Sequence, residues 1–176
     1  MNEIQEKLER ELHQKVVLYT SLGGGCIGNA LKVVTENGNK YFVKSYDNSK
    51  MHQAEANGLN ELKTANAIRI PRVLKFNDDF IFLEYIESAS PVKDFSRKFG
   101  RQFAQLHRAK GNNYGYFEDN FIGSTEQINL PQNDNWPEFF LENRLMFQFR
   151  IAERNRYSNS QLMEGMKSIE KNIATI

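Results

Sequence analysis

The chain has 176 residues, 40% of them hydrophobic and 26% charged, which predicts a soluble globular protein with one ordinary domain or two small lobes. A formal net charge of +1 gives no electrostatic case for nucleic-acid binding, and no apolar run approaches the roughly 18 residues needed for a membrane-spanning helix. The single cysteine excludes an internal disulfide and fits a reducing cytoplasm.

The first half of the chain predicts an antiparallel five-stranded sheet with one packed helix. In chain order we expect a short helix over 2–13, strands over 15–22, 27–35 and 40–46, a helix over 50–64, an extended segment over 70–76 and a strand over 80–86. Asn37 and Gly38 predict a tight hairpin turn, because this pair accepts positive φ angles. The hydrophobic run of the last strand predicts an interior position in the sheet.

The second half is predicted to be mostly helical. We expect a helix capped by Ser90 with Pro91 at its first position, a loop-rich aromatic connection over 111–135, a helix opened by Trp136 and a last helix capped within 158–160. An apolar stripe on the first of these helices is expected to be buried: Val92, Phe95, Phe99, Phe103 and Leu106. The last helix reaches the apolar Ile176 without a closing glycine, so we expect a truncated chain.

Three consecutive glycines separate the first two predicted strands. Gly23, Gly24 and Gly25 are followed by Cys26. Glycine weakens a strand but lets the backbone approach a ligand closely, so the turn is either a flexible hairpin or a loop that covers phosphates. Cys26 adds the hypothesis of a redox role, such as an intermolecular disulfide.

Lys44 and Glu55 are candidates for binding the phosphates of a nucleotide. Lys44 follows Tyr41-Phe42-Val43 near the end of the third predicted strand, where a solvent-facing lysine is the ordinary alternative. Glu55 lies within the apolar stripe of the following helix, between Met51 and Leu59. A carboxylate on such a face needs a partner, because unpaired burial costs several kcal/mol. We therefore predict a Lys44–Glu55 ion pair, which in kinases orients the lysine toward phosphate.

Glu84, Tyr85 and Ile86 end the last strand of the predicted sheet. In a kinase-like fold this segment joins the two lobes and its backbone contacts the adenine edge, whereas the simpler alternative is a plain edge strand.

Two segments that look like kinase motifs do not fit that role. His107 and Arg108 are followed by Ala109 where a catalytic aspartate would stand, and Asp94-Phe95 precedes His107 where a magnesium motif would follow it. We expect His107 to be structural, at a helix end. No metal site is predicted, so the phosphotransfer base and the magnesium ligands are expected to be absent from this chain.

With these residues in place, the chain resembles the fructosamine kinase family (ketosamine-3-kinases). The most specific blocks are Tyr114-Gly115-Tyr116, residues 119–127, residues 136–140, Arg144-Leu145 and Gln148; earlier blocks are residues 23–27, 41–44, 54–59, 70–73, 83–86 and 100–107. The resemblance implies an α+β, protein-kinase-like fold related to aminoglycoside phosphotransferases. It also implies ATP- and magnesium-dependent phosphorylation of a sugar hydroxyl on ketosamine small molecules or glycated proteins.

The resemblance assigns an ATP-binding lobe to 1–86 and a partial helical lobe to 87–176. The ATP-phosphate site would comprise the glycine turn with Cys26, Lys44 and Glu55, and Glu84 to Ile86 would contact the adenine. Asp119, Asn120 and Trp136 would lie near the acceptor cleft, although Trp136 fits a core role equally well.

The chain lacks the His-Gly-Asp catalytic loop and the later magnesium-binding aspartate of the family. We therefore expect little activity from the chain alone. Two alternatives stay open: a catalytically dead remnant that binds nucleotide or forms a homodimer, and a kinase for another small hydroxylated substrate.

Overall fold

A computed structural model describes residues 3–23 and 27–175 of the chain. It divides into two compact units, Met1–Ala109 and Lys110–Ile176. Among the described residues, no helix is both long enough and apolar enough to span a membrane.

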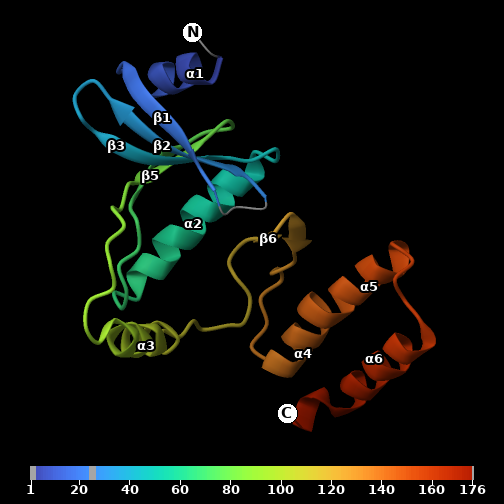
Figure 1. Cartoon of the computed structure of the whole chain (residues 1–176). Helices are drawn as coiled ribbons and strands as arrows, with labels where there is room; N and C mark the ends of the chain where they lie inside the picture. The colour runs from blue at the N-terminus through green and yellow to red at the C-terminus, as the bar shows by residue number, and fades with distance from the viewer. Residues whose placement is uncertain (1–2, 24–26, 176) are drawn as a thin grey trace. The chain divides into compact units, whose positions relative to one another are not determined.

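The first unit contains the predicted five-stranded antiparallel sheet (Figure 1). Its strands are β1 (Val16–Leu22), β2 (Asn29–Thr35), β3 (Lys40–Ser45), β4 (Val73–Phe76) and β5 (Ile81–Glu84). Their order in the sheet is β1-β2-β3-β5-β4. β5 pairs with β3 on one side and β4 on the other, so its interior position is confirmed.

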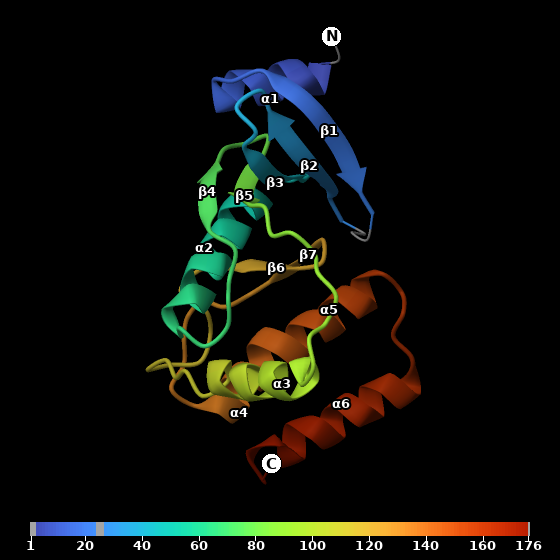
Figure 2. The same cartoon turned by 60° about the vertical axis from the view of Figure 1, so that its left-hand side comes forward.

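One helix packs on each face of this sheet, as Figures 1 and 2 show from two directions. Strand alternation explains the two faces, because successive side chains point to opposite sides. On the face of α1 (Glu3–Leu12), Leu8 packs with a cluster that includes Val43 and Phe82. On the face of α2 (Lys50–Thr64), Ala56 packs with Ile81 and Leu83, and with the half-buried Phe42.

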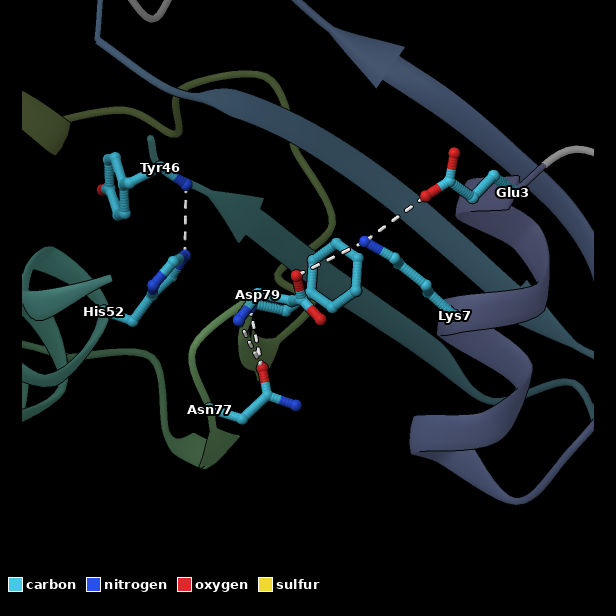
Figure 3. A network of polar contacts seen from close by, with 7 residues as sticks. Glu3, Lys7, Tyr46, His52, Asn77 and Asp79 are labelled. Carbon is cyan, nitrogen blue, oxygen red and sulfur yellow. Dashed lines mark hydrogen bonds and ion pairs between the residues drawn. The ribbon is translucent and has the colours of Figure 1, made fainter. Parts of the chain in front are cut away.

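Polar contacts also attach α1 to the turn between β4 and β5 (Figure 3). Lys7 Nζ lies 3.5 Å from Asp79 Oδ1 and 3.6 Å from Glu3 Oε1. Asn77 Oδ1 accepts hydrogen bonds from the backbone N–H groups of Asp79 and Phe80, which shapes the turn.

The hairpin turn between β2 and β3 forms as predicted but uses one positive φ angle rather than two. Gly38 has φ +77°, whereas Asn37 does not have a positive φ. The Gly38 N–H donates to Thr35 O at 2.9 Å, and the Thr35 N–H donates to Asn39 O at 3.0 Å. An ordinary turn followed by a left-handed glycine therefore closes the hairpin.

The buried stripe of α2 differs from the prediction. The fully buried residues are His52 and Ala56, whereas Leu62, which continues the helical spacing of Met51, Glu55 and Leu59, is 43% exposed. Periodicity identifies residues that share a helix face, but it does not show which of them lie deepest in the core. Here the most deeply buried part of the face is formed by His52 and Ala56. At the helix start, Asn48 Oδ1 accepts a hydrogen bond from the Lys50 N–H at 3.1 Å.

The prediction for α3 (Phe95–Leu106) is wrong in two respects. The helix begins at Phe95, after Asp94 in a left-handed conformation, and not at Pro91. Its aromatic side chains share one face as predicted, but Phe95, Phe99 and Phe103 are 42–49% exposed rather than buried. Periodicity determines which residues share a face and does not determine what covers it. His107 is the C-cap residue, and its ring lies edge-on to Phe103.

The second unit contains a small hairpin and two helical segments. Its elements are β6 (Asn120–Ile122), β7 (Thr125–Gln127), α4 (Trp136–Phe140), the π-helical η1 (Leu141–Met146), α5 (Phe147–Arg154), α6 (Ser160–Asn172) and the 3-10 turn η2 (Ile173–Thr175). The hairpin β6–β7 interrupts the connection that was predicted as loop. α4, η1 and α5 form one uninterrupted helical run, which matches the single helix predicted from Trp136. Asn159 Oδ1 caps α6 by accepting from the Leu162 N–H at 2.8 Å.

Candidate functional site

The predicted ion pair between Lys44 and Glu55 is present in the first unit. Lys44 Nζ donates to Glu55 Oε1 at 2.7 Å and to Glu55 Oε2 at 2.9 Å. The two side chains are 25% and 23% exposed, so the pair is largely but not completely withdrawn from water. β3 brings Lys44 to the α2 face of the sheet, because Lys44 alternates with Phe42, and the second turn of α2 brings Glu55 to meet it.

Tyr46 completes this cluster. Its hydroxyl donates a hydrogen bond to Glu55 Oε2 at 2.5 Å, and Lys44 Nζ lies 4.8 Å from the centre of its ring. Burial, and then the hydrogen bond to the Glu55 carboxylate, raise the pKa of the Tyr46 hydroxyl above its ordinary value. The hydroxyl therefore keeps its proton and acts as a donor to the carboxylate.

His52 holds the backbone of Tyr46 in place (Figure 3). Its Nε2 accepts the Tyr46 N–H at 3.1 Å, and its Nδ1 lies 3.1 Å from Ser49 O. Nε2 must be the unprotonated nitrogen, so Nδ1 carries the proton and donates to the Ser49 carbonyl. The fully buried His52 ring thus has both nitrogens engaged.

Gly28, which directly precedes β2, lies beside this cluster. Gly23 and Gly28 are described, whereas Gly24, Gly25 and Cys26 lie outside the described residues. The redox hypothesis for Cys26 therefore stays a prediction. A Cβ atom at Gly28 would lie 2.7 Å from Ser45 O and 2.7 Å from Cδ1 of the Tyr46 ring. Gly28 therefore lets the backbone just before β2 pack directly on Tyr46.

The segment predicted to contact adenine lies at the end of β5. The Glu84 carboxylate accepts from Arg69 Nη2 at 2.7 Å and from the Arg72 N–H at 3.2 Å. The Arg69 hydrogen bond, above all, holds the pKa of Glu84 below its ordinary value. β5 ends at Glu84, so Tyr85 and Ile86 lie beyond its last paired position.

Lys32 Nζ, from β2, lies 4.6 Å from the centre of the Tyr85 ring.

In the second unit, Asp119 and Asn120 are part of a hydrogen-bonded network. Asp119 Oδ1 accepts from the backbone N–H groups of Asn129 and Leu130, at 2.7 and 3.0 Å. The buried Asn129 Nδ2 donates to Asn120 Oδ1 at 2.9 Å, and Asn129 Oδ1 accepts from Arg144 Nη2 at 2.5 Å. Burial lowers the pKa of Arg144. These contacts give both predicted substrate residues a structural task; their role toward a substrate stays a prediction.

Trp136 stacks on Phe140, with ring centroids 4.9 Å apart and 15° between planes, and is 36% exposed. The same unit carries an open, mostly apolar groove of about 510 Å³. Its lining includes Ile122, Arg144, Leu145, Phe149, Leu162 and Met166.

Within residues 3–23 and 27–175, no three histidine, cysteine or acidic side chains are grouped so that they would hold a metal ion.

A model of the fructosamine kinase family matches residues 1–176. The chain belongs to the fructosamine kinase family. A relative from rice, Oryza sativa subsp. indica, is named protein-ribulosamine 3-kinase, chloroplastic. It is 36% identical over 166 residues, which is 89% of this chain and 47% of the relative. The chain thus spans about half the length of such curated relatives.

Solved structures show that this family member has a protein-kinase-like fold. A protein from Thermobifida fusca, assigned as a fructosamine-3-kinase, has a TM-score of 0.77 at 24% identity, over 99% of this chain and 61% of that chain. An ADP-bound aminoglycoside phosphotransferase has a TM-score of 0.57 at 16% identity, over 98% of this chain and 58% of that chain. At these identities the likeness establishes the fold alone.

Sequence reasoning missed Gly28, Tyr46 and His52. A signal for Tyr46 was available, since it stands two residues after Lys44 and strand alternation places both on one face. No comparable signal existed for His52, because its contact depends on the path of the link between β3 and α2. Gly28 requires the same tertiary information.

Proposed function

We propose that the first unit binds ATP, and that the whole protein is an ATP-dependent phosphotransferase acting on a sugar hydroxyl of ketosamine adducts. The observation that carries this proposal is the Lys44–Glu55 pair at 2.7 Å on the α2 face of the sheet. Membership of the fructosamine kinase family supports the substrate class.

The cluster fits a phosphate group. Lys44 donates two hydrogen bonds to Glu55, and an ammonium group has three donors, so one remains to face a phosphate oxygen. Glu55 holds the lysine head in one position, which reduces the entropy lost when a ligand binds. ATP, when bound, supplies the phosphoryl group that is transferred.

Each remaining part of the proposed site has a separate task. The glycine-rich sequence between β1 and β2 is proposed to bind the phosphates, because glycine permits close approach of the backbone to a ligand. Residues 84–86 present backbone groups beyond the end of β5 to the adenine edge. In the second unit, Asp119, Asn120 and Trp136 are proposed to lie near the sugar acceptor.

Magnesium binding is not assigned to this chain. The described residues offer no cluster of carboxylates that would hold the ion, so no step of the proposal passes through it.

We also propose, from the family, that glycated proteins are among the substrates, which would make the whole protein a deglycation enzyme. The single cysteine supports a cytoplasmic location, although the rice relative is named chloroplastic. The exposed aromatic face of α3 supports homodimerisation, which sedimentation of the chain over a range of concentrations would test.

A turnover screen of the whole protein tests the proposed activity. ADP release would be measured with fructosyl-lysine, ribulosyl-lysine and the matching free sugars, for the wild type and for Lys44→Ala. We expect turnover with the lysine adducts and its loss in Lys44→Ala. Turnover confined to free sugars or to another hydroxylated amine would support the alternative kinase, and binding of ATP without any turnover would support the inactive remnant.

A further inference from the structure

Tyr46 contacts three parts of the proposed nucleotide site at once. Its hydroxyl donates to Glu55 Oε2 at 2.5 Å, its ring lies 4.8 Å from Lys44 Nζ, and the edge of the ring packs against Gly28. It therefore joins helix α2, the lysine of β3 and the backbone at Gly28, just before β2.

The hydroxyl fixes the carboxylate that holds the lysine. Glu55 Oε1 receives one hydrogen bond from Lys44, while Oε2 receives one from Lys44 and one from Tyr46. Without the hydroxyl, the Glu55 side chain would be restrained by Lys44 alone, and the pair would be free to rotate together. Tyr46 supplies a second anchor from a different direction, and it does so with a neutral donor that leaves the charge of the carboxylate intact.

The ring restrains the backbone at Gly28. A methyl group at Gly28 would lie 2.7 Å from both Ser45 O and the ring, a separation at which one of the groups has to move. The backbone of Gly28 is thus in close contact with Tyr46, and the position of Gly28 at the start of β2 depends on where that ring lies.

Tyr46 is itself held in place. The buried His52 accepts its backbone N–H at 3.1 Å, and the two rings lie 5.2 Å apart. The first turn of α2 therefore immobilises the residue that positions Glu55 one turn later.

We propose that Tyr46 is a positioning residue of the nucleotide site, which sets the Lys44–Glu55 pair through its hydroxyl and the backbone at Gly28, just before β2, through its ring. The inference rests on the proposed function of the first unit in binding ATP.

Tyr46→Phe tests the hydroxyl, because it removes the hydrogen bond and keeps the ring beneath Lys44 and beside Gly28. Tyr41→Phe is the matched control: Tyr41 lies on β3, which ends one residue before Tyr46, but its ring packs against the cluster on the α1 face. Gly28→Ala tests the close packing at Gly28, where the methyl group would meet both the Tyr46 ring and Ser45 O, with Gly58→Ala as its control, since a methyl group at Gly58 meets no atom within 4 Å.

Two measurements are made on each variant. The first is the rate at which acetic anhydride modifies Lys44 relative to the exposed Lys63, read by peptide mass spectrometry, which needs no nucleotide. The second is the Kd for Mg-ATP and for adenosine.

We expect Tyr46→Phe and Gly28→Ala to raise the modification of Lys44 several-fold, while both controls match the wild type. We expect Tyr46→Phe to weaken Mg-ATP by about tenfold, from the loss of one hydrogen bond to a charged group, and to leave adenosine unchanged. A merely structural role would weaken both ligands together.

An unchanged Lys44 modification rate in Tyr46→Phe would overturn the proposal, as would equal losses for Mg-ATP and adenosine. If the wild type binds neither ligand, the proposed ATP binding fails, and the modification rates alone still decide whether Tyr46 positions Lys44.

Discussion

Breaking the Lys44–Glu55 pair should destabilise the first unit by an amount that its partial burial determines. Exposed pairs contribute about 0–1 kcal/mol, and removing one partner of a buried pair costs about 3–5 kcal/mol. With 25% and 23% of the two side chains exposed, we expect Glu55→Gln to cost about 2 kcal/mol, between these limits. Lys44→Met should cost a similar amount, since Glu55 then keeps only the Tyr46 hydroxyl.

A double-mutant cycle isolates the pair itself. When one partner has been replaced, replacing the other removes no ion pair and lowers the free energy of unfolding less. Lys44→Met combined with Glu55→Gln should therefore cost less than the sum of the single changes, by about 1–2 kcal/mol. The control cycle uses Lys40→Met and Glu87→Gln, a neighbouring ion pair whose side chains are 46% and 59% exposed. Its coupling should stay below about 1 kcal/mol.

Hydrogen exchange of the β3 amides (Lys40–Ser45) provides the free energies, because it reports on the first unit alone. The single tryptophan, Trp136, lies in the second unit, so its fluorescence serves as an internal control that should not change. If the Lys44 and Glu55 effects simply add, to within about 0.5 kcal/mol, the two groups do not interact as described.

Three further predictions concern other parts of the chain. Asn129→Leu should destabilise the second unit by about 3 kcal/mol in urea unfolding followed by Trp136 fluorescence, because it leaves buried partners unsatisfied; a loss under about 1 kcal/mol would contradict the network. Gly38→Ala should cost about 1 kcal/mol of stability for its positive φ alone. Gly115→Ala should cost about 1–3 kcal/mol more than Gly38→Ala, because its methyl group would lie 2.5 Å from Asn129 O. Equal losses of stability in unfolding followed by circular dichroism would refute this ranking. The hydrogen bond from Lys15, above all, lowers the pKa of Glu9, so the stabilising effect of its carboxylate should be complete above about pH 4.5 and fade as pH falls through the lower folded-state pKa. Glu9→Gln should therefore lower Tm at pH 7, and its Tm should converge with that of the wild type in acid. A Tm difference that does not depend on pH would contradict this prediction.

The sheet and its ion pair were predictable because their signals are local. Alternating apolar residues identify each strand, and a carboxylate within an apolar helical stripe, such as Glu55, implies a partner. The turn at Gly38 follows from two adjacent residues. Each of these inferences needs only a few neighbouring positions.

The contacts that were missed depend on residues distant in the sequence. The three-residue strands β6 and β7 are too short for periodicity to reveal, and the hydrogen bonds of Asn129 and Arg144 that surround them join separate segments. The Ser90-Pro91 pair is compatible with a helix start, but the helix begins at Phe95. The sequence places the aromatic residues of α3 on one face without specifying a covering surface.

Calorimetric titration of the chain with Mg-ATP tests the central claim most directly. We predict measurable binding by the wild type, its loss in Lys44→Ala, and unchanged binding in Lys63→Ala, which removes an exposed lysine from the far end of α2. Absence of binding by the wild type at millimolar Mg-ATP, or equal binding by wild type and Lys44→Ala, would contradict the assignment of this lobe to ATP.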